Sequence, residues 1–487
     1  MRLIVSLHGV DAAELFREEG SGHLCFRYLA GYVEMNGLPI SHSLPLSDEI
    51  VKETYGKLHP YFSNLMPEGW TKQIAIDYNL GFNDDLFALL KLNNPIGAIA
   101  FRKGDSSALT KTDNSSLIVL AEQVLAHPPH ILHCLACGKG LISPGYNQGL
   151  HDPCSKKFFG TQKAPSLELD WGSIRGKVRK QLECGVVLTG VHPKFSAVMK
   201  TQRNTLTTKV QSAHYIVKPE PKDEYFKDMT RLEASVSQFA AHLKLRICDN
   251  LLYFLSDGSP VCIIKRFDLI GSGDLFHKLH MEDSAQALGV HPESKYRKGS
   301  HEKIGKIIRD KTMLPENAVK QLLSEYFRIT LFNFITANAD AHLKNHSFFH
   351  LRKTDVEIMG IDHPLLWPIK KHLKLGLDDF FKDRTHITIP TPWYDIFPAR
   401  IFPSGDEDDL GLSVCGKTRN LTKPHFVELA NYLGIGKQQA GRIFNSIVRG
   451  FEKGAQTLDN ILTRNDVSKV KQDLLRNYID QKLDILR

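Results

Sequence analysis

The sequence lacks any apolar stretch long enough to cross a membrane, and its first residues do not follow the pattern of a secretion signal. The N-terminal apolar run meets Asp11 and Glu14 too early to form the core of a signal peptide. There is also no internal repeat and no low-complexity tract. These absences argue against membrane, secreted and repeat proteins, and they predict a protein that is made and kept in the cytoplasm.

Cysteine is scarce, with 8 residues in a chain of 487. Five of the eight are scattered and stand mostly beside apolar residues, as reduced core thiols do, namely Cys25, Cys184, Cys248, Cys262 and Cys415. The other three lie close together between residues 134 and 154, so they need a separate explanation.

Neither sign of charge dominates strongly. The net charge of +8 is spread over 487 residues, which suits a polyanionic partner but fits a solvated basic surface better than direct binding of nucleic acid. The apolar and charged fractions, 42% and 24%, are those of a folded protein. A chain of this length is too long for one hydrophobic core and should divide into about three units.

The order of apolar patterns predicts several units along the chain. Residues 1–108 alternate short apolar runs with polar turns and change to helical spacing near 84–92, which predicts a small α+β unit. Residues 117–126 have helical periodicity, a cysteine-bearing module follows at 125–160, and 161–184 are linker-like. Residues 185–316 show the strand, turn, strand, helix and paired-strand order of a nucleotide-binding lobe. Long apolar-periodic helices fill 317–487.

The loop NADAHLKN, residues 338–345, carries the clearest chemical pattern. Four residues separate Asp340 from Asn345, the spacing of the catalytic loop of protein kinases, and His342 and Lys344 lie between them. The preceding helix, 326–337, is almost wholly apolar, so its burial would hold the loop rigidly at a cleft. An isolated pattern of this kind is more often a polar helix cap and turn. The kinase interpretation therefore depends on further partners.

Two such partners occur earlier in the chain. Lys218 ends the strand-like HYIVKP, where it compares with the kinase lysine that binds ATP phosphates, and Glu233 on the next predicted helix could pair with it. In the turn LTGVHPK, Gly190 would let the backbone approach a phosphate and Lys194 would add positive charge. Each feature alone is weak, since the lysine could be a surface residue and the turn an ordinary hairpin.

A second magnesium-binding carboxylate should follow the catalytic loop at the end of a strand. Asp362 lies 17 residues beyond Asn345, and Asp395 lies 50 residues beyond it. Both follow apolar segments, so spacing alone leaves the choice open.

The clustered cysteines have the spacing of a zinc site. Cys134 and Cys137 form CxxC, and His151 with Cys154 forms HxxC. Thirteen residues separate Cys137 from His151. Three thiolates and an imidazole would fill a closed, structural tetrahedral Zn²⁺ site with no open position for catalysis. The alternative is a set of reduced thiols beside a coincidental histidine.

Many short segments, taken in order, resemble the HipA family of toxin kinases. In the first hundred residues these are SHSLPLS (41–47), YFSNLMPEG (61–69), DDLFALL (84–90) and GAIAF (97–101). In the remainder they are TGVHPK, YIVKP, KRFD, HMEDSAQALG (280–289), SKYRKG, NADAHLKN, PWYDIFP and LGLSVCGKTRNL (410–421). The resemblance implies an α+β, bilobal protein-kinase-like fold with a small N-terminal α+β subdomain, to which the zinc-knuckle module would be an insertion.

The same resemblance implies a role for each matching residue. Asp340 would orient or deprotonate the acceptor, with His342 and Lys344 beside it in the catalytic loop. Asn345 and Asp395 would bind Mg²⁺, so the family order favours Asp395 over Asp362, although an apparent insertion at 355–388 departs from that order. The implied ATP-binding residues are Thr189, Gly190, Val191, Lys194, Lys218, Glu233, Lys265, Phe267 and Asp268. Among them, the backbone from Lys265 to Phe267 would be the adenine hinge, and Asp268 would face the ribose.

Regulation is a second departure from the family. HipA-type kinases switch themselves off by phosphorylating their own serine just before the glycine-containing loop. In this sequence Val187 stands at that position, and Thr189 has the only hydroxyl nearby. Inhibitory autophosphorylation would therefore have moved to Thr189 or be absent.

The resemblance implies an ATP- and Mg²⁺-dependent serine/threonine kinase acting on a translation-related or other cytoplasmic protein. Its implied partner is a HipB-like DNA-binding antitoxin, through which nucleic acid would be reached only indirectly. The alternative function is a catalytically weak kinase-fold scaffold that binds an antitoxin or nucleic acid.

Overall fold

The computed structural model describes most of the chain. The described residues are 2–54, 56–82, 85–92, 95, 97–104, 118–120, 131–167, 171–188, 190, 192–199, 213–255, 257–272, 275–403 and 407–487. Thr189 and Val191, both predicted to bind ATP, lie outside them. Among the described helices, none combines the length and the apolar character that crossing a membrane requires.

The N-terminal part forms an antiparallel sheet of five strands in the order β4-β3-β2-β1-β5. A two-residue turn at His8 and Gly9, both with positive φ, joins β1 to β2, as a tight hairpin requires. Four short helices accompany the sheet, and α4 is the helix predicted near 84–92. The strands are β1 (Arg2–Leu7), β2 (Val10–Arg17), β3 (Leu24–Tyr28), β4 (Val51–Lys52) and β5 (Ile99–Lys103). The helices are α1 (Ala30–Glu34), α2 (Pro60–Ser63), α3 (Gly69–Asp77) and α4 (Leu86–Lys91).

A second five-stranded sheet has the order β6-β7-β8-β10-β9, and β6 runs parallel to β7. The helix predicted over 117–126 is therefore wrong at 118–120, because pairing with β7 makes this apolar run a strand. The strands are β6 (Ile118–Leu120), β7 (Phe195–Met199), β8 (Tyr215–Pro219), β9 (Asn250–Phe254) and β10 (Pro260–Lys265). Helices α7 (Ile174–Glu183) and α8 (Met229–His242) pack on this sheet.

The cysteine-bearing segment contributes two short helices, α5 (Tyr146–Gly149) and α6 (Asp152–Phe159). Apolar residues of this segment, including Cys134, Leu135 and Phe159, belong to the same buried cluster as the second sheet. The segment is therefore packed onto the sheet.

The C-terminal part is helical around α11 (Glu316–Ile335), whose second half is almost completely buried. A small antiparallel sheet in the order β13-β14-β15 lies beside it, and the predicted insertion at 355–388 forms α12–α14 between β14 and β15. The strands are β11 (Leu269–Ser272), β12 (Leu275–Lys278), β13 (His280–Asp283), β14 (Ser347–Leu351) and β15 (Ile387–Pro390). The remaining helices are α9 (Ser284–Ala287), α10 (His301–Asp310), α12 (Lys353–Met359), α13 (Lys370–Leu373), α14 (Leu377–Phe381), α15 (Lys423–Tyr432), α16 (Lys437–Arg464) and α17 (Lys469–Leu486).

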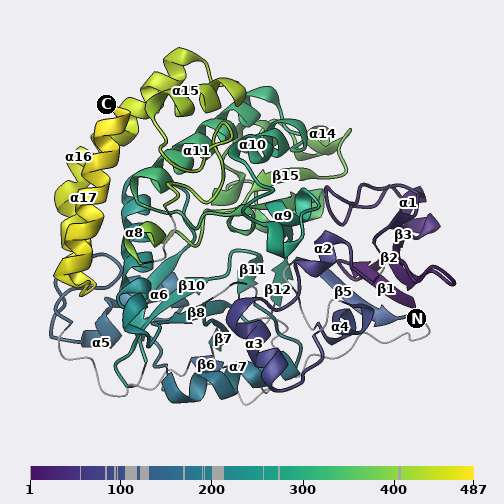
Figure 1. The fold of residues 1–487 in the computed structure, drawn as a ribbon, viewed down its shortest axis with the longest axis horizontal. Helices are drawn as coiled ribbons and strands as arrows, with labels where there is room; N and C mark the ends of the chain where they lie inside the picture. Colours follow the sequence, from purple (N-terminus) through teal and green to yellow (C-terminus); the bar gives the residue numbers. More distant parts are fainter. Residues whose placement is uncertain are drawn as a thin grey trace.

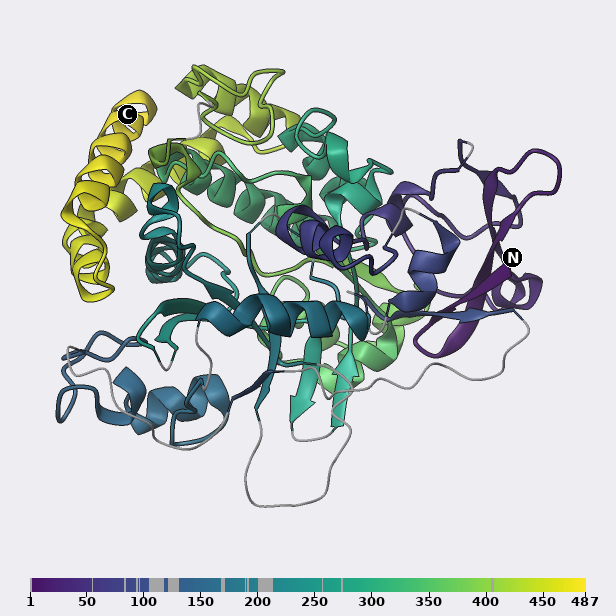
Figure 2. The same cartoon turned by 60° about the horizontal axis from the view of Figure 1, so that its bottom comes forward.

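The N-terminal sheet and the last two helices lie at opposite ends of the molecule (Figure 1). Seen from another side, the long pair α16 and α17 still lies farthest from the N-terminal sheet (Figure 2). Helix α2 contacts α9, which joins the N-terminal unit to the middle of the molecule. The functional residues gather in this middle region.

Candidate active site

One cleft collects every described residue that the sequence predicted for ATP binding and catalysis. Its lining comes from the second sheet, from the helical part and from the N-terminal unit, which supplies Asn64, Leu65 and Glu68. The predicted residues that line it are Gly190, Lys194, Lys218, Glu233, Lys265, Phe267, Asp268, Asp340, His342, Lys344, Asn345 and Asp395.

Lys218 is the centre of a buried ionic cluster at the end of β8. Its Nζ lies 2.5 Å from Glu233 Oε1 on α8 and 2.5 Å from Asp395 Oδ1. Burial alone would lower the pKa of Lys218, but the two carboxylates raise it above its usual value. The predicted pairing of Lys218 with Glu233 is thus present in the structure, and Lys218 is held charged.

Asp395 belongs to this cluster and Asp362 does not. Asn345 Nδ2 donates to Asp395 Oδ2 at 3.1 Å, which brings together the two residues proposed for magnesium. Asp395 has φ of +59°, a left-handed conformation that a non-glycine residue adopts at some cost. Asp362, by contrast, is 69% exposed and pairs with Lys370 at 2.8 Å. Geometry therefore separates two candidates that spacing could not.

Asp340 stands where the catalytic loop leaves α11. Ala337, two residues after the end of this helix, has φ of +63° and turns the chain into the cleft. The Tyr296 hydroxyl donates a hydrogen bond to Asp340 Oδ1. Burial raises the pKa of Asp340 above its ordinary value, and the bond from Tyr296 partly opposes this effect.

His342 is almost completely buried beside this aspartate. Its backbone N–H donates to the Asp340 carbonyl at 2.7 Å, and its ring lies 4.9 Å from the Tyr296 ring, edge to face. Burial holds the pKa of His342 well below its usual range, so the ring is neutral near pH 7. These contacts favour a role in orienting the loop.

The ammonium group of Lys344 is engaged by the N-terminal unit and by Asp283. Its Nζ lies 2.9 Å from Asn64 Oδ1, 3.2 Å from Glu68 Oε1 and 3.1 Å from Asp283 Oδ2. Lys295 also reaches Glu68, at 3.3 Å. The catalytic loop is thus fastened to a segment more than 250 residues earlier in the sequence.

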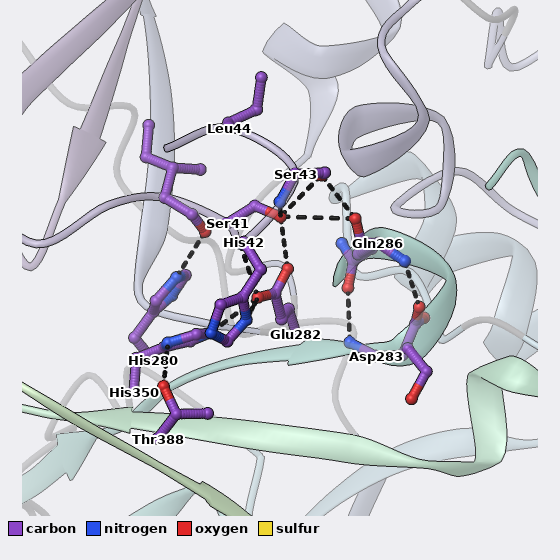
Figure 3. Close-up of polar contacts among 12 residues, drawn as sticks. Ser41, His42, Ser43, Leu44, His280, Glu282, Asp283, Gln286, His350 and Thr388 are labelled. Carbon is purple, nitrogen blue, oxygen red and sulfur yellow. Dashed lines mark hydrogen bonds and ion pairs between the residues drawn. The ribbon is translucent and has the colours of Figure 1, made fainter. Parts of the chain in front are cut away.

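A second buried polar network lies next to Asp283 and is shown in Figure 3. The Glu282 carboxylate, which has no exposed surface, contacts His42 Nδ1 and His350 Nε2, each at 2.8 Å. Ser41 Oγ donates to its other oxygen at 2.5 Å. Burial would raise the pKa of Glu282, but the hydrogen bonds from His350 and His42 hold it well below its usual value. Adjacent residues, Glu282 and Asp283, therefore link the N-terminal unit to the core and to the catalytic loop.

Phe267 and Asp268, which were predicted to lie at the adenine and the ribose, also line the cleft. Both oxygens of Asp268 are engaged by Arg266, at 2.9 and 2.5 Å, so Asp268 would have to loosen this pair to bind a ribose. Phe267 packs against Tyr394, with ring centroids 5.7 Å apart. Gly190, which also lines the cleft, has φ of +121°, a conformation that favours glycine strongly.

The four residues predicted to bind zinc lie together outside the cleft. The ligand atoms of Cys134, Cys137, His151 and Cys154 are all within 4.8 Å of one another. This proximity fits a tetrahedral metal ion, in which neighbouring ligand atoms are roughly 3 to 4 Å apart.

Sequence reasoning missed several residues of the site. Asn64, Glu68, Asp283, Lys295 and Tyr296 were seen only as parts of family-like segments, namely YFSNLMPEG, HMEDSAQALG and SKYRKG. Their concentration in such segments was the only available signal, because the contacts join parts far apart in the chain.

Comparison with known proteins agrees with the geometry. Residues 3–102 match the model of the HipA N-terminal domain, and residues 186–358 match that of the HipA-like C-terminal domain. A chain of the HipA, HipB and operator DNA complex of Shewanella oneidensis MR-1 is similar in fold, with a TM-score of 0.60 at 17% identity. That similarity covers 99% of this chain and 96% of the other.

Two curated relatives are each named a putative kinase. Y4mE of Sinorhizobium fredii is 30% identical over 167 residues, which are 34% of this chain and 38% of Y4mE. A Haemophilus influenzae protein is 25% identical over 236 residues, which are 46% of this chain and 62% of that protein. The chain thus matches less than two thirds of the length of either relative. Together, the two domain matches and the shared fold show that the chain belongs to the HipA-like family.

Proposed function

We propose that the protein is an ATP- and Mg²⁺-dependent kinase that phosphorylates serine or threonine in another protein. The observation that carries this proposal is the convergence of Lys218, Glu233, Asn345 and Asp395 in one cleft with Asp340. A lysine for the phosphates, two oxygen-bearing metal ligands and an acceptor-orienting aspartate are the parts that phosphoryl transfer requires. A scaffold would have no need to bury this set of charges.

The residues present fit Mg²⁺ and ATP. Asn345 donates its amide N–H₂ to Asp395 Oδ2, which leaves its own carbonyl oxygen as a hard ligand for the metal. Asp395 Oδ1, which contacts Lys218 here, would be the second such ligand once Lys218 turns to the phosphates. When bound, Mg²⁺ would neutralise charge on the ATP phosphates. Lys218, freed from Asp395 in part, would hold the phosphates while Glu233 keeps it in place. Asp340 would accept the proton of the acceptor hydroxyl, for which a raised pKa is an advantage.

The partner and the regulation follow from the family and are part of the proposal. The similar Shewanella complex contains HipA, HipB and operator DNA. We therefore expect a HipB-like DNA-binding antitoxin, with nucleic acid reached only through it. Val187 is buried and has no hydroxyl, so inhibitory autophosphorylation either occurs at Thr189 or is absent.

The proposed units are an N-terminal subdomain at 1–108, a zinc-knuckle module at 125–160, a linker at 161–184, a nucleotide-binding lobe at 185–316 and a helical lobe at 317–487. The predicted linker contains the helix α7, which packs on the second sheet. We also propose that Zn²⁺ is the ion that Cys134, Cys137, His151 and Cys154 hold, because three sulfurs and an imidazole suit zinc better than magnesium or calcium.

Two measurements on the purified protein test the proposal. Mg·ATP should stabilise the wild type against heat, and labelled ATP should give phosphoserine or phosphothreonine in a protein of a cell extract. The Asp340→Ala variant should keep the stabilisation and lose the transfer. A salt-sensitive shift with nucleic acid, without any effect of nucleotide, would instead support the scaffold.

A further inference from the structure

The cysteine and histidine cluster has no part in the chemistry of the cleft, yet it is built against the helix that carries Glu233. We propose that metal binding by Cys134, Cys137, His151 and Cys154 braces α8 and so controls how firmly Glu233 holds Lys218. The effect on nucleotide binding rests on the proposed kinase function, whereas the metal site and its contact with α8 do not.

The four side chains are arranged as a metal knuckle. Gly138 has φ of +76°, and its N–H donates to the Cys134 carbonyl at 2.8 Å, which folds the CxxC segment into a tight turn. The second pair comes from the start of α6, and Cys137 Sγ lies 3.4 Å from His151 Nδ1. This separation is close to that of two ligands of one tetrahedral zinc ion.

The histidine is oriented as a ligand. His151 Nε2 lies 2.9 Å from the Gly140 carbonyl, to which it can donate its proton. That hydrogen bond leaves Nδ1, the nitrogen facing the sulfurs, unprotonated and able to bind a metal. Metal-bound histidines in proteins are commonly fixed in this way by a carbonyl group.

The knuckle touches α8 directly. Leu135, which stands between the two cysteines of the turn, is 1% exposed, and its carbonyl accepts a hydrogen bond from Gln238 Nε2 at 3.4 Å. Arg464, at the end of α16, donates to Gln238 Oε1 at 2.6 Å. Figure 1 shows α5 and α6 below α8 and beside the adjoining ends of α16 and α17. Gln238 is therefore shared by the knuckle and the helical part.

The fit of the knuckle against Arg464 is close. A Cβ atom at Gly138 would collide with Arg464 Nη1, so any other residue at this turn would displace the guanidinium from its present position. One residue further along the chain, Asn465 Nδ2 donates to Ser235 Oγ at 2.9 Å. The last half of α8 is thus clamped between the metal knuckle and the C-terminal end of α16.

Movement at Gln238 can change the position of Glu233 in the cleft because the two residues lie five residues apart on one continuous helix. Small cysteine and histidine modules commonly depend on their metal for their folded conformation. Loss of the metal would free the knuckle turn, weaken its contact with Gln238 and let α8 move. Glu233 would then hold Lys218 less firmly.

The test measures metal content and the motion of α8 before any activity. Full-length wild type should contain one zinc per chain by elemental analysis, and Cys137→Ser, a change at an exposed position, should contain none. Hydrogen exchange at 229–242 without nucleotide should be faster in Cys137→Ser than in wild type. The matched control, Cys184→Ser, removes a thiol outside the cluster and should change neither quantity.

A second variant keeps the metal and removes the brace. Gln238→Ala should retain zinc, speed exchange in α8 and weaken ATP binding on the order of tenfold, as expected of coupling between sites. Zinc removal from the wild type by a chelator should speed α8 exchange in the same way if Cys137→Ser fails to fold. A wild type without zinc, or unchanged α8 exchange in metal-free protein and in Gln238→Ala, would overturn the inference. Altered exchange without phosphoryl transfer would leave it standing and contradict the kinase proposal.

Discussion

At the scale of single residues, the cleft depends on the balance of buried charges around Lys218. One ammonium group compensates the carboxylates of Glu233 and Asp395, both at 2.5 Å. Burial raises the pKa of Glu233, which shows how much this carboxylate relies on its cation. Asp340 lies in the same cleft and accepts its hydrogen bond from the Tyr296 hydroxyl, while the charge of Asp395, a member of the Lys218 cluster, adds to the rise of its pKa.

The first prediction concerns the pH dependence of the proposed transfer. In the proposed transfer the ionised form of Asp340 is the active one, so activity should fall as the pH drops through its pKa, which burial raises above the usual value. The Tyr296 hydrogen bond lowers this pKa. Tyr296→Phe should therefore raise the pKa of Asp340 and move the acid limb of kcat/KM to higher pH. Measuring kcat/KM between about pH 4 and pH 8 checks this expectation.

The control for this measurement is Tyr225→Phe. Tyr225 is 57% exposed, and no hydrogen bond among the described residues joins it to Asp340. Its acid limb should coincide with that of the wild type. A limb that stays in place, or moves to lower pH, in Tyr296→Phe would refute the role given to this tyrosine.

At the scale of elements, the segment joining α2 to α3 lines the candidate active site although it belongs to the N-terminal unit. Asn64 and Glu68 hold Lys344, and Glu68 also holds Lys295, the neighbour of Tyr296. Lys344 was predicted as catalytic, and its contacts favour a positioning role instead. The N-terminal unit thereby fixes the loop that carries Asp340.

Glu68→Gln tests this positioning. The change removes one charge from a buried cluster, so the free energy of unfolding should fall by about 1–3 kcal/mol. The kcat should fall while the KM for ATP changes little, because the Lys218 cluster is untouched. Glu34→Gln, on the exposed face of α1, should change stability by less than about 0.5 kcal/mol. Equal kcat and equal stability in Glu68→Gln and wild type would contradict the proposed coupling.

The neighbouring Glu282 network predicts a dependence of stability on pH. In the folded protein the pKa of Glu282 is depressed below its unfolded value of about 4.3, so its contribution to stability is complete above that value. The contribution is lost as the pH falls through the folded pKa. Glu282→Gln should therefore lower the free energy of unfolding by about 1.5–3 kcal/mol near pH 7, as expected for the loss of hydrogen bonds to a buried charged group.

Urea unfolding at a series of pH values measures this effect. The difference in the free energy of unfolding between wild type and Glu282→Gln should narrow below about pH 4. Protonation of Glu282 then removes from the wild type a stabilisation that the variant lacks at every pH. In Glu34→Gln the difference from wild type should stay small at every pH. If the difference in the free energy of unfolding between wild type and Glu282→Gln stayed constant down to acid pH, the carboxylate would not be held ionised by His42 and His350.

Local pattern predicted many elements and failed where pairing decides. The buried periodicity of 326–337 predicted the second half of α11, and the strand before Lys218 is β8. The run at 118–120 could not be assigned from periodicity, because a short apolar segment suits a helix or a strand until a partner such as β7 is known. The apolar residues of the insertion at 355–388 pack against those of the sheet β13-β14-β15, so the insertion lengthens the path to Asp395 without displacing it.

At the scale of the whole molecule, the cleft exists only because three parts of the chain meet. The spacing of Asp340 and Asn345 and the strand position of Lys218 were visible in the sequence. The choice of Asp395 over Asp362 needed the resemblance to a family, and the participation of Asn64 and Glu68 needed the structure. Contacts across more than 200 residues leave no periodic trace in a single sequence, so the N-terminal wall of the site could not be derived from it.

The two candidate aspartates supply the most direct test of the whole account. Wild type, Asp395→Asn and Asp362→Asn would each be incubated with Mg²⁺, a cell extract and ATP labelled in its terminal phosphate. We predict that Asp362→Asn labels protein as the wild type does, and that Asp395→Asn transfers at least about 100-fold less. Equal labelling by Asp395→Asn and wild type would contradict the assignment of this cleft as the site of phosphoryl transfer.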